Sequence, residues 1–328
     1  MKEMLINSIN VIKNIEGQFS VDDLEPKLWS EGHNEKFWVE FEKLSGSLNL
    51  EVNKLAIMID INSSKKSTDQ EIEPLCKNIE QISIALWSTF LLLSPNAGHT
   101  YCLNVAQSFQ GIICSTKEFL MSLLHCSKRQ EVLTKVGEVI ERYDHIKMKI
   151  SRNNVKAVCK ALMEQRALVQ DALTELNEAK DMCDKGLSDE NWTPSELQLL
   201  HPSLGLIKTA SAILKRISSA LKAKGKPFDS QAVKEMDEIL RNCQRISPSV
   251  DDLAVPLYPS MSRQEVDEES KKLSQVLKEV LESLKNVSFV SEDDYNEWGK
   301  FLWNAVDHNV TKLDITLAGD LVQSLGLK

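Results

Sequence analysis

Apolar residues recur every three or four positions along most of this chain, and this spacing constrains the fold more than any other feature. One such run contains Phe37, Phe41, Leu44, Leu48, Val52, Leu55 and Ile59. A second run contains Ile72, Leu75, Ile79, Ile82, Leu86, Phe90 and Leu93. Because side chains three and four positions apart share one face of an α-helix, both runs predict long amphipathic helices with a buried stripe.

Similar stripes continue to near the end of the chain. They predict further helices near 101–123, 132–146, 153–183, 193–225, 233–243, 262–287 and 291–317. Several helix starts carry a hydroxyl with Glu or Gln three residues later, as in a capping box: Thr68-x-x-Glu71, Ser127-x-x-Gln130, Thr193-x-x-Glu196 and Ser262-x-x-Glu265. With only 12 glycines and 9 prolines in 328 residues, turns are few, and the chain is predicted to be all-α.

The length of the chain favours two domains, because 328 residues exceed what one ordinary core supports. The stretch from Asp184 to Trp192 contains a glycine and three acids and is the best boundary on composition. We therefore predict two consecutive antiparallel helical bundles of about five helices each, over residues 1–188 and 189–328. The helix near 153–183 is assigned to the first bundle as its fifth member.

Charge and cysteine content narrow the functional classes. A formal net charge of -9 disfavours direct nucleic-acid binding, because phosphate contacts need clustered Lys and Arg. Seven cysteines at irregular spacings favour reduced thiols, which indicates a cytoplasmic or nuclear chain. The sequence shows no evident signal peptide. The longest apolar stretch, Ile82 to Leu93, is too short to span a bilayer, so no membrane partner is expected.

Sequence motifs that carry catalysis are missing. The sequence contains no G-x-G-x-x-G or P-loop motif for phosphates, no G-x-S-x-G and no H-E-x-x-H. Glu141 and His145 come closest to a metal pair, but they are four apart without a second pair, and a surface helix pair explains them better. Asp251 and Asp252 lack the third carboxylate of a magnesium diphosphate motif. We therefore predict a non-enzyme without catalytic residues, cofactor or metal site.

A proline-rich segment from Ser247 to Pro259 interrupts the helical pattern. Because proline lacks an N–H and fixes φ, a helix cannot continue through Pro256 and Pro259, and a rigid corner is predicted. Ser247 and Ser249 are predicted to cap a helix, with Asp251 and Asp252 in its first turn. The apolar residues predicted to reach the core are Val250, Leu253 and Leu257.

Three hydroxyl residues precede proline, which is the minimal context for proline-directed kinases. They are Ser94, Thr193 and Ser247, and each also marks a predicted helix boundary. A phosphate at Thr193 would lie at a helix N-terminus, where negative charge is favourable.

The segment Arg245-Ile246-Ser247-Pro248-Ser249-Val250-Asp251-Asp252-Leu253-Ala254, continuing to Leu257-Tyr258-Pro259, resembles the signature of the cyclin-D-binding protein family, also known as the GCIP family. Similarity extends to 208–216 and 272–281, and more loosely to 37–38 and 153–176. The long acidic insertion of vertebrate members is here only the short stretch 184–190.

The resemblance implies a fold like the talin and vinculin rod bundles and a function in protein interaction. Members are described as nuclear and cytoplasmic negative regulators of cell-cycle progression that bind D-type cyclins and helix-loop-helix transcription factors. The oligomeric state is open, with a monomer favoured, and a cytoskeletal or adhesion scaffold is the alternative function. The candidate partner-binding residues are Ser247, Pro248, Asp251, Asp252, Pro256, Tyr258 and Pro259.

Overall fold

The computed structural model describes residues 2–59, 68–125, 129–187 and 191–324, with side chains up to residue 318. Within these ranges all regular structure is helical and no strand occurs, which confirms the predicted all-α class. No helix in the described ranges has the length and apolar content needed to cross a membrane. The predicted Ser127 cap lies outside the described residues.

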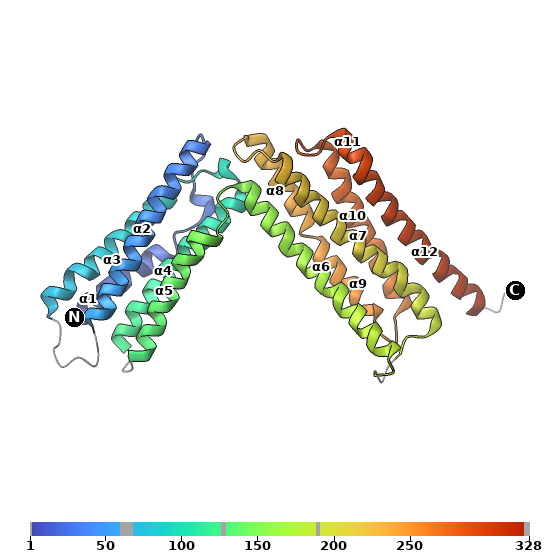
Figure 1. Cartoon of the computed structure of the whole chain (residues 1–328), viewed down its shortest axis with the longest axis horizontal. Helices are drawn as coiled ribbons and strands as arrows, with labels where there is room; N and C mark the ends of the chain where they lie inside the picture. The colour runs from blue at the N-terminus through green and yellow to red at the C-terminus, as the bar shows by residue number, and fades with distance from the viewer. Residues whose placement is uncertain (1, 60–67, 126–128, 188–190, 325–328) are drawn as a thin grey trace. The chain divides into compact units, whose positions relative to one another are not determined.

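The chain divides into two compact units, Met1–Ala157 and Val158–Lys328. The long helices of the first unit lie alongside one another (Figure 1) and are α1 (Lys2–Glu16), α2 (Glu31–Met58), α3 (Asp69–Phe90), α4 (His99–His125) and α5 (Arg129–Lys149). The second unit holds nearly all of α6 (Asn154–Asp184), followed by α7 (Pro194–Lys224), α8 (Ser230–Cys243), α9 (Ile246–Ala254), α10 (Arg263–Ser283), the one-turn α11 (Glu292–Asp294) and α12 (Lys300–Ser324).

The division between the units differs from the boundary expected at 188–189 and changes the assignment of α6. Cys159 of α6 donates its thiol to the Ser218 carbonyl of α7, and Gln165 accepts a hydrogen bond from Ser247 of α9. These contacts tie α6 to the second unit, so the fifth helix of the first unit is α1. Both α6 and α7 therefore belong to the second unit, and Gly186 lies in the turn that ends α6.

Aromatic rings fill the core of the first unit. Phe41 of α2 stacks on Phe109 of α4, with ring centroids 4.2 Å apart. Phe37, Phe90 and Phe19 surround this pair and are buried. Such aromatic side chains remove large apolar areas from water, and their offset and edge contacts add directional preference. The stripe predicted from the spacing of α2 is thus the side of the helix that packs against α3, α4 and α5.

A buried polar triad fixes the end of this core where α2 meets α4. The indole N–H of Trp38 donates to the Tyr101 hydroxyl at 2.8 Å, and that hydroxyl donates to Asn34 Oδ1 at 2.7 Å. The Asn34 amide in turn donates to the Arg152 carbonyl. Tyr101 is fully buried. Every polar group of the triad is therefore satisfied inside the protein, as burial requires.

Gly98 forms the turn that leads into α4, and its backbone lies against the side chain of Asn154. Its φ of 108° lies in a region that L side chains rarely adopt, and a Cβ there would lie 2.2 Å from Asn154 Cγ. Asn154 Oδ1 accepts from the backbone N–H of Tyr101 at 3.1 Å. The glycine is thus required by both the backbone conformation and the close approach.

The helices of the second unit pack around α7 and α10. α7 runs unbroken through Pro202 and begins with the predicted capping box of Thr193 and Glu196. α10 contacts α7, α8, α9 and α12. α12 runs antiparallel to α7, because Lys224 at the end of α7 pairs with Asp294 ahead of α12, and Gly205 lies against Asn309. A π-helical turn over Tyr295–Gly299 leads into α12.

We expect Tyr101→Phe to lower the free energy of unfolding by about 2 kcal/mol, because it leaves the Trp38 N–H and Asn34 Oδ1 buried without their partner. Tyr143→Phe is the matched control, since Tyr143 is half-buried on α5 and its hydroxyl makes no hydrogen bond to any described residue. Urea denaturation of both variants measures the difference. Equal stability of the two variants would contradict the role assigned to the triad.

Candidate interaction site

The signature segment folds as a short helix followed by a turn. Two residues separate the end of α8 from α9, which begins at Ile246, and its N-cap Arg245 makes no side-chain cap. Pro248 is tolerated because it lies in the first turn, where backbone N–H groups have no partner within the helix. The helix ends at Ala254, before Pro256 as predicted, and Val255–Leu257 form one 3-10 turn.

The serines of this segment do not cap the helix as predicted. The Ser249 hydroxyl donates to the Arg245 carbonyl, and the buried Ser247 hydroxyl donates to Gln165 Oε1 at 2.8 Å. The helix starts at Ile246, two residues earlier than a cap at Ser247 requires and four earlier than a cap at Ser249 requires, so both serines already lie inside it. The contact with Ser247 also explains why a polar residue, Gln165, interrupts the apolar stripe of α6.

Asp251 and Asp252 lie in the second half of α9, not in its first turn. Both are exposed. Partial desolvation of its carboxyl group, which disfavours the charged form, raises the pKa of Asp251, and the neighbouring negative charge of Asp252 raises it further. Acids near a helix C-terminus also face the negative end of the helix dipole. This placement is electrostatically unfavourable for the folded chain alone.

The two sides of α9 have different surroundings. Ile246, Val250, Leu253 and Leu257 are fully buried, which agrees with the core contacts predicted for the last three. The opposite side presents Pro248, Asp251, Asp252 and Val255, joined by Tyr258 from the turn, and we call these five residues the α9 face. Val255 is 72% exposed and Tyr258 is 38% exposed.

The seven predicted site residues are therefore divided by burial. Pro248, Asp251, Asp252 and Tyr258 belong to the α9 face, whereas Ser247 and Pro256 are buried and Pro259 is half-buried. Val255 was missed because an apolar residue between buried neighbours resembles a core position. Its position seven residues after Pro248, on the same side of the helix, could have identified it.

Two side chains at the start of α7 hold the turn after α9, and we call Trp192 and Glu196 the corner clamp. The Trp192 indole N–H donates to the Leu257 carbonyl at 2.7 Å. Glu196 Oε1 accepts from the backbone N–H of Met261 at 2.9 Å, while its Oε2 accepts from the Thr193 backbone N–H at 2.7 Å. Between the two contacts, Ser260 has a φ of 67°, a strained conformation for a residue with a side chain.

Glu196 is charged because hydrogen bonds outweigh its burial. Burial raises its pKa, but bonds from Thr193 and Met261, together with the charge of Arg263, lower the pKa below its ordinary value overall. The carboxylate thus contributes stability through one helix cap and one long-range contact. The sequence predicted the cap, but not that the second oxygen would reach a residue 65 positions away.

The three predicted phosphorylation sites differ in access. Ser94 is fully buried, accepts from the Lys27 N–H and donates to the Lys27 carbonyl. Ser247 is buried against Gln165. Thr193 is exposed. Thr193 is the predicted site whose hydroxyl a kinase can reach in the folded chain.

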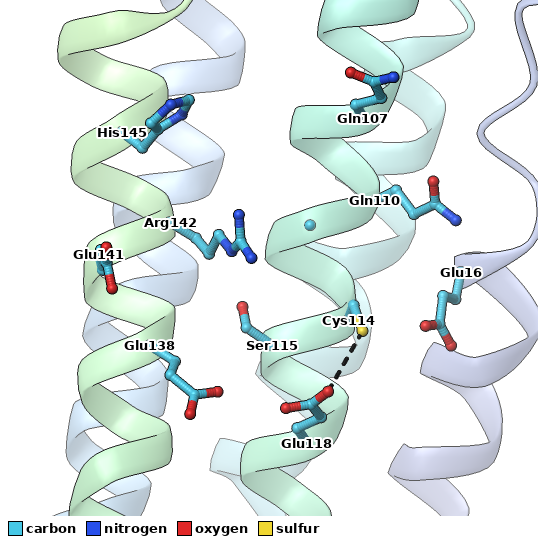
Figure 2. Close-up of a pocket in the computed structure, with 11 residues that line it drawn as sticks. Glu16, Gln107, Gln110, Cys114, Ser115, Glu118, Glu138, Glu141, Arg142 and His145 are labelled. Atoms are coloured by element: carbon cyan, nitrogen blue, oxygen red, sulfur yellow. Dashed lines mark hydrogen bonds between the residues drawn. The ribbon is translucent and has the colours of Figure 1, made fainter. Parts of the chain in front are cut away.

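A polar pocket of about 530 Å³ lies in the first unit between α1, α4 and α5, and it contains Glu141 and His145. Figure 2 shows Arg142 extending from α5 toward α4 across this pocket. Its carboxylates are largely compensated by lysines: Glu118 and Glu138 pair with Lys135, and Glu16 pairs with Lys117. No group of three or more metal-ligating side chains occurs among the described residues.

The Cys114 thiol in this pocket is a poor nucleophile. Burial and the neighbouring carboxylate of Glu16 raise its pKa, so it remains protonated at neutral pH. Its Sγ lies 3.8 Å from Glu118 Oε1. The pocket is a charge-compensated surface groove, and the α9 face is the stronger candidate site.

The helical fold and the exposed α9 face define a class of helical interaction proteins. Sequence models described as Grap2 and cyclin-D-interacting match the chain in both halves, the N-terminal model over residues 40–182 and the C-terminal model over 169–282. The chain belongs to this family of cyclin-D-interacting proteins, and the α9 face lies within the C-terminal match.

Curated relatives cover most of the chain. A Cyclin-D1-binding protein 1 homolog from Xenopus laevis is 27% identical over 88% of this chain and 92% of the relative. The homolog from Danio rerio is 27% identical over 87% of each chain. Cyclin-D1-binding protein 1 from Homo sapiens is 26% identical over 86% of this chain and 85% of the relative.

We expect Glu196→Gln to lower the free energy of unfolding at neutral pH by about 2 kcal/mol, because an amide cannot accept all the bonds made by the carboxylate. The lowered pKa of Glu196 adds stability that is fully present at pH values above its ordinary pKa of about 4.5. This stability is lost as the pH falls through the lower pKa that Glu196 has in the folded chain. The difference between wild type and variant should therefore shrink over that range.

Glu265→Gln is the matched control, since Glu265 is an exposed first-turn acid of α10 whose side chain makes no hydrogen bond within the described part of the chain. It should change stability by less than about 0.5 kcal/mol. Denaturant unfolding at several pH values measures both variants. A Glu196→Gln protein as stable as wild type at neutral pH would contradict the clamp.

Proposed function

We propose that this chain is a non-enzymatic interaction protein that binds a D-type cyclin. The observation that carries the proposal is family membership over both halves of the chain, among relatives whose names state binding to cyclin D1. The α9 face presents exposed apolar and acidic side chains that a partner protein can contact, which supports binding as the activity.

We further propose the α9 face as the contact surface. Tyr258 and Val255 supply apolar area that is exposed in the free chain, and tyrosine is one of the residue types that most often dominate binding energy. The corner clamp holds Tyr258 between two fixed points, Leu257 and Met261, so little order has to be gained on binding.

The charge of the α9 face favours a basic contact on the partner. Asp251 and Asp252 repel each other and face the negative end of α9. Lys272 of α10 lies within electrostatic range of Asp252 but pairs with Glu269 at 2.6 Å. A Lys or Arg of the partner placed beside the two aspartates would relieve this repulsion and steer the encounter.

The regulatory part of the proposal follows from the family description. Binding of a D-type cyclin would restrain cell-cycle progression by lowering phosphorylation of the retinoblastoma protein, and a helix-loop-helix factor is a second proposed partner. The chain would act in the nucleus and cytoplasm, as a monomer and without direct DNA contact. A kinase assay with purified cyclin complex, with and without this chain, tests the inhibition.

We expect the double charge reversal Asp251→Lys with Asp252→Lys to weaken binding of a purified D-type cyclin at least about tenfold, measured by titration calorimetry. Tyr258→Ala should weaken it to a similar extent through lost apolar contact. The matched control is the reversal of Asp22 and Asp23, an exposed aspartate pair in the first unit.

The control variant should bind as wild type does, and circular dichroism verifies that all variants remain helical. If the wild-type chain binds no D-type cyclin at micromolar concentration, the proposed function is wrong. If it binds and both reversals weaken binding equally, the α9 face is not the contact surface.

A further inference from the structure

We propose that Thr193 is a modification site for a proline-directed protein kinase, and that a phosphate on Thr193 releases Glu196 from the corner that follows α9. The argument uses contacts within the second unit and does not depend on the binding of a cyclin. It rests on the access to the hydroxyl, on its hydrogen bonds and on the position of Arg263.

Thr193 meets the geometric requirements of such a kinase better than the other Ser/Thr-Pro sites. It is exposed, and its backbone is extended, with φ -68° and ψ 158°. Pro194 follows directly, which gives the minimal Thr-Pro context of such a kinase. Ser94 and Ser247 precede proline as well, but both are buried in the folded chain.

The hydroxyl of Thr193 is part of the support for Glu196. Thr193 Oγ1 donates to Glu196 Oε2 at 2.8 Å and accepts from the Glu196 backbone N–H at 3.3 Å. Phosphorylation removes the donated proton and places a group of nearly two negative charges next to the carboxylate. The two anions cannot share this position, so the Glu196 side chain must move away.

Arg263 provides a cationic neighbour for the new phosphate. Its guanidinium donates to the Ser195 hydroxyl at 2.8 Å, two residues beyond Thr193, and its charge also acts on Glu196. Arginine binds phosphate oxygens through paired charge-assisted hydrogen bonds. A phosphate on Thr193 therefore competes with Glu196 for the same cation, in addition to repelling the carboxylate.

Loss of Glu196 affects the turn that carries Tyr258. The Met261 N–H then loses its acceptor, Glu196 Oε1, while the strained Ser260 lies directly before it. Trp192 still holds the Leu257 carbonyl, so one of the two contacts of the corner clamp remains. The expected result is a locally loosened segment 258–261 in a chain that stays folded.

The chemistry is an ordinary phosphoryl transfer. The kinase transfers the γ-phosphoryl group of ATP to Thr193 Oγ1, so an oxygen–phosphorus bond forms there and the bond to the β-phosphate oxygen breaks. ADP leaves, and a base of the kinase takes the hydroxyl proton. A phosphatase restores the hydroxyl by hydrolysis.

The test treats the purified full chain with a proline-directed kinase and ATP and locates the phosphate by mass spectrometry. Thr193 should be the labelled Ser/Thr-Pro site, Thr193→Ser should still be labelled, and Thr193→Val and Pro194→Ala should lose about tenfold or more of the label. Circular dichroism verifies the fold of each variant, and Thr193→Ser keeps both the cap and the acceptor.

Amide hydrogen exchange then measures the released clamp. Exchange of the Met261 N–H should accelerate at least about tenfold on phosphorylation. The Val266 N–H, which bonds to the Ser262 carbonyl without involving Glu196, should be unchanged as the internal control. A folded chain that is not labelled at Thr193, or a labelled chain whose Met261 exchange is unchanged, would overturn the proposal.

Discussion

The structure depends on one constraint: a long amphipathic helix in water gains most of its stability by burying its apolar stripe. Each unit satisfies this constraint with its own core. In the first, the stripes of α2 and α4 meet in the stack of Phe41 on Phe109. In the second, α7 and α10 are surrounded by the other helices, and even the signature segment contributes Val250, Leu253 and Leu257. What is left outside the two cores is the surface available for partners.

The corner clamp links this packing to the candidate site. Trp192 and Glu196 begin a helix that belongs to the core, yet their polar atoms reach the backbone of the turn after α9. The position of Tyr258 is therefore set by the start of α7 as well as by α9 itself. This connection also makes the site sensitive to the hydroxyl of Thr193, which supports the same carboxylate.

The sequence predicted the helices well because their stripes and capping boxes are local signals, as at Thr68 and Thr193. It failed where a residue's role depends on distant contacts. α6 was assigned to the wrong unit because its stripe does not reveal which helices cover it. The local pattern of Ser249 and Asp251 predicts a cap followed by a first turn, but the helix already begins at Ile246, because a proline in the first turn leaves a helix intact. The α9 face can be recognised only from the burial of each residue, because Val255 is exposed whereas Leu253 and Leu257 are buried.

Hydrogen exchange of the whole chain, with and without a saturating purified D-type cyclin, tests the central claim most directly. If the chain binds the cyclin through the α9 face, amides of residues 246–261 should exchange more slowly in the complex, while α1 to α5 keep their free rates. Binding accompanied by slower exchange in the first unit, with residues 246–261 unchanged, would contradict the account.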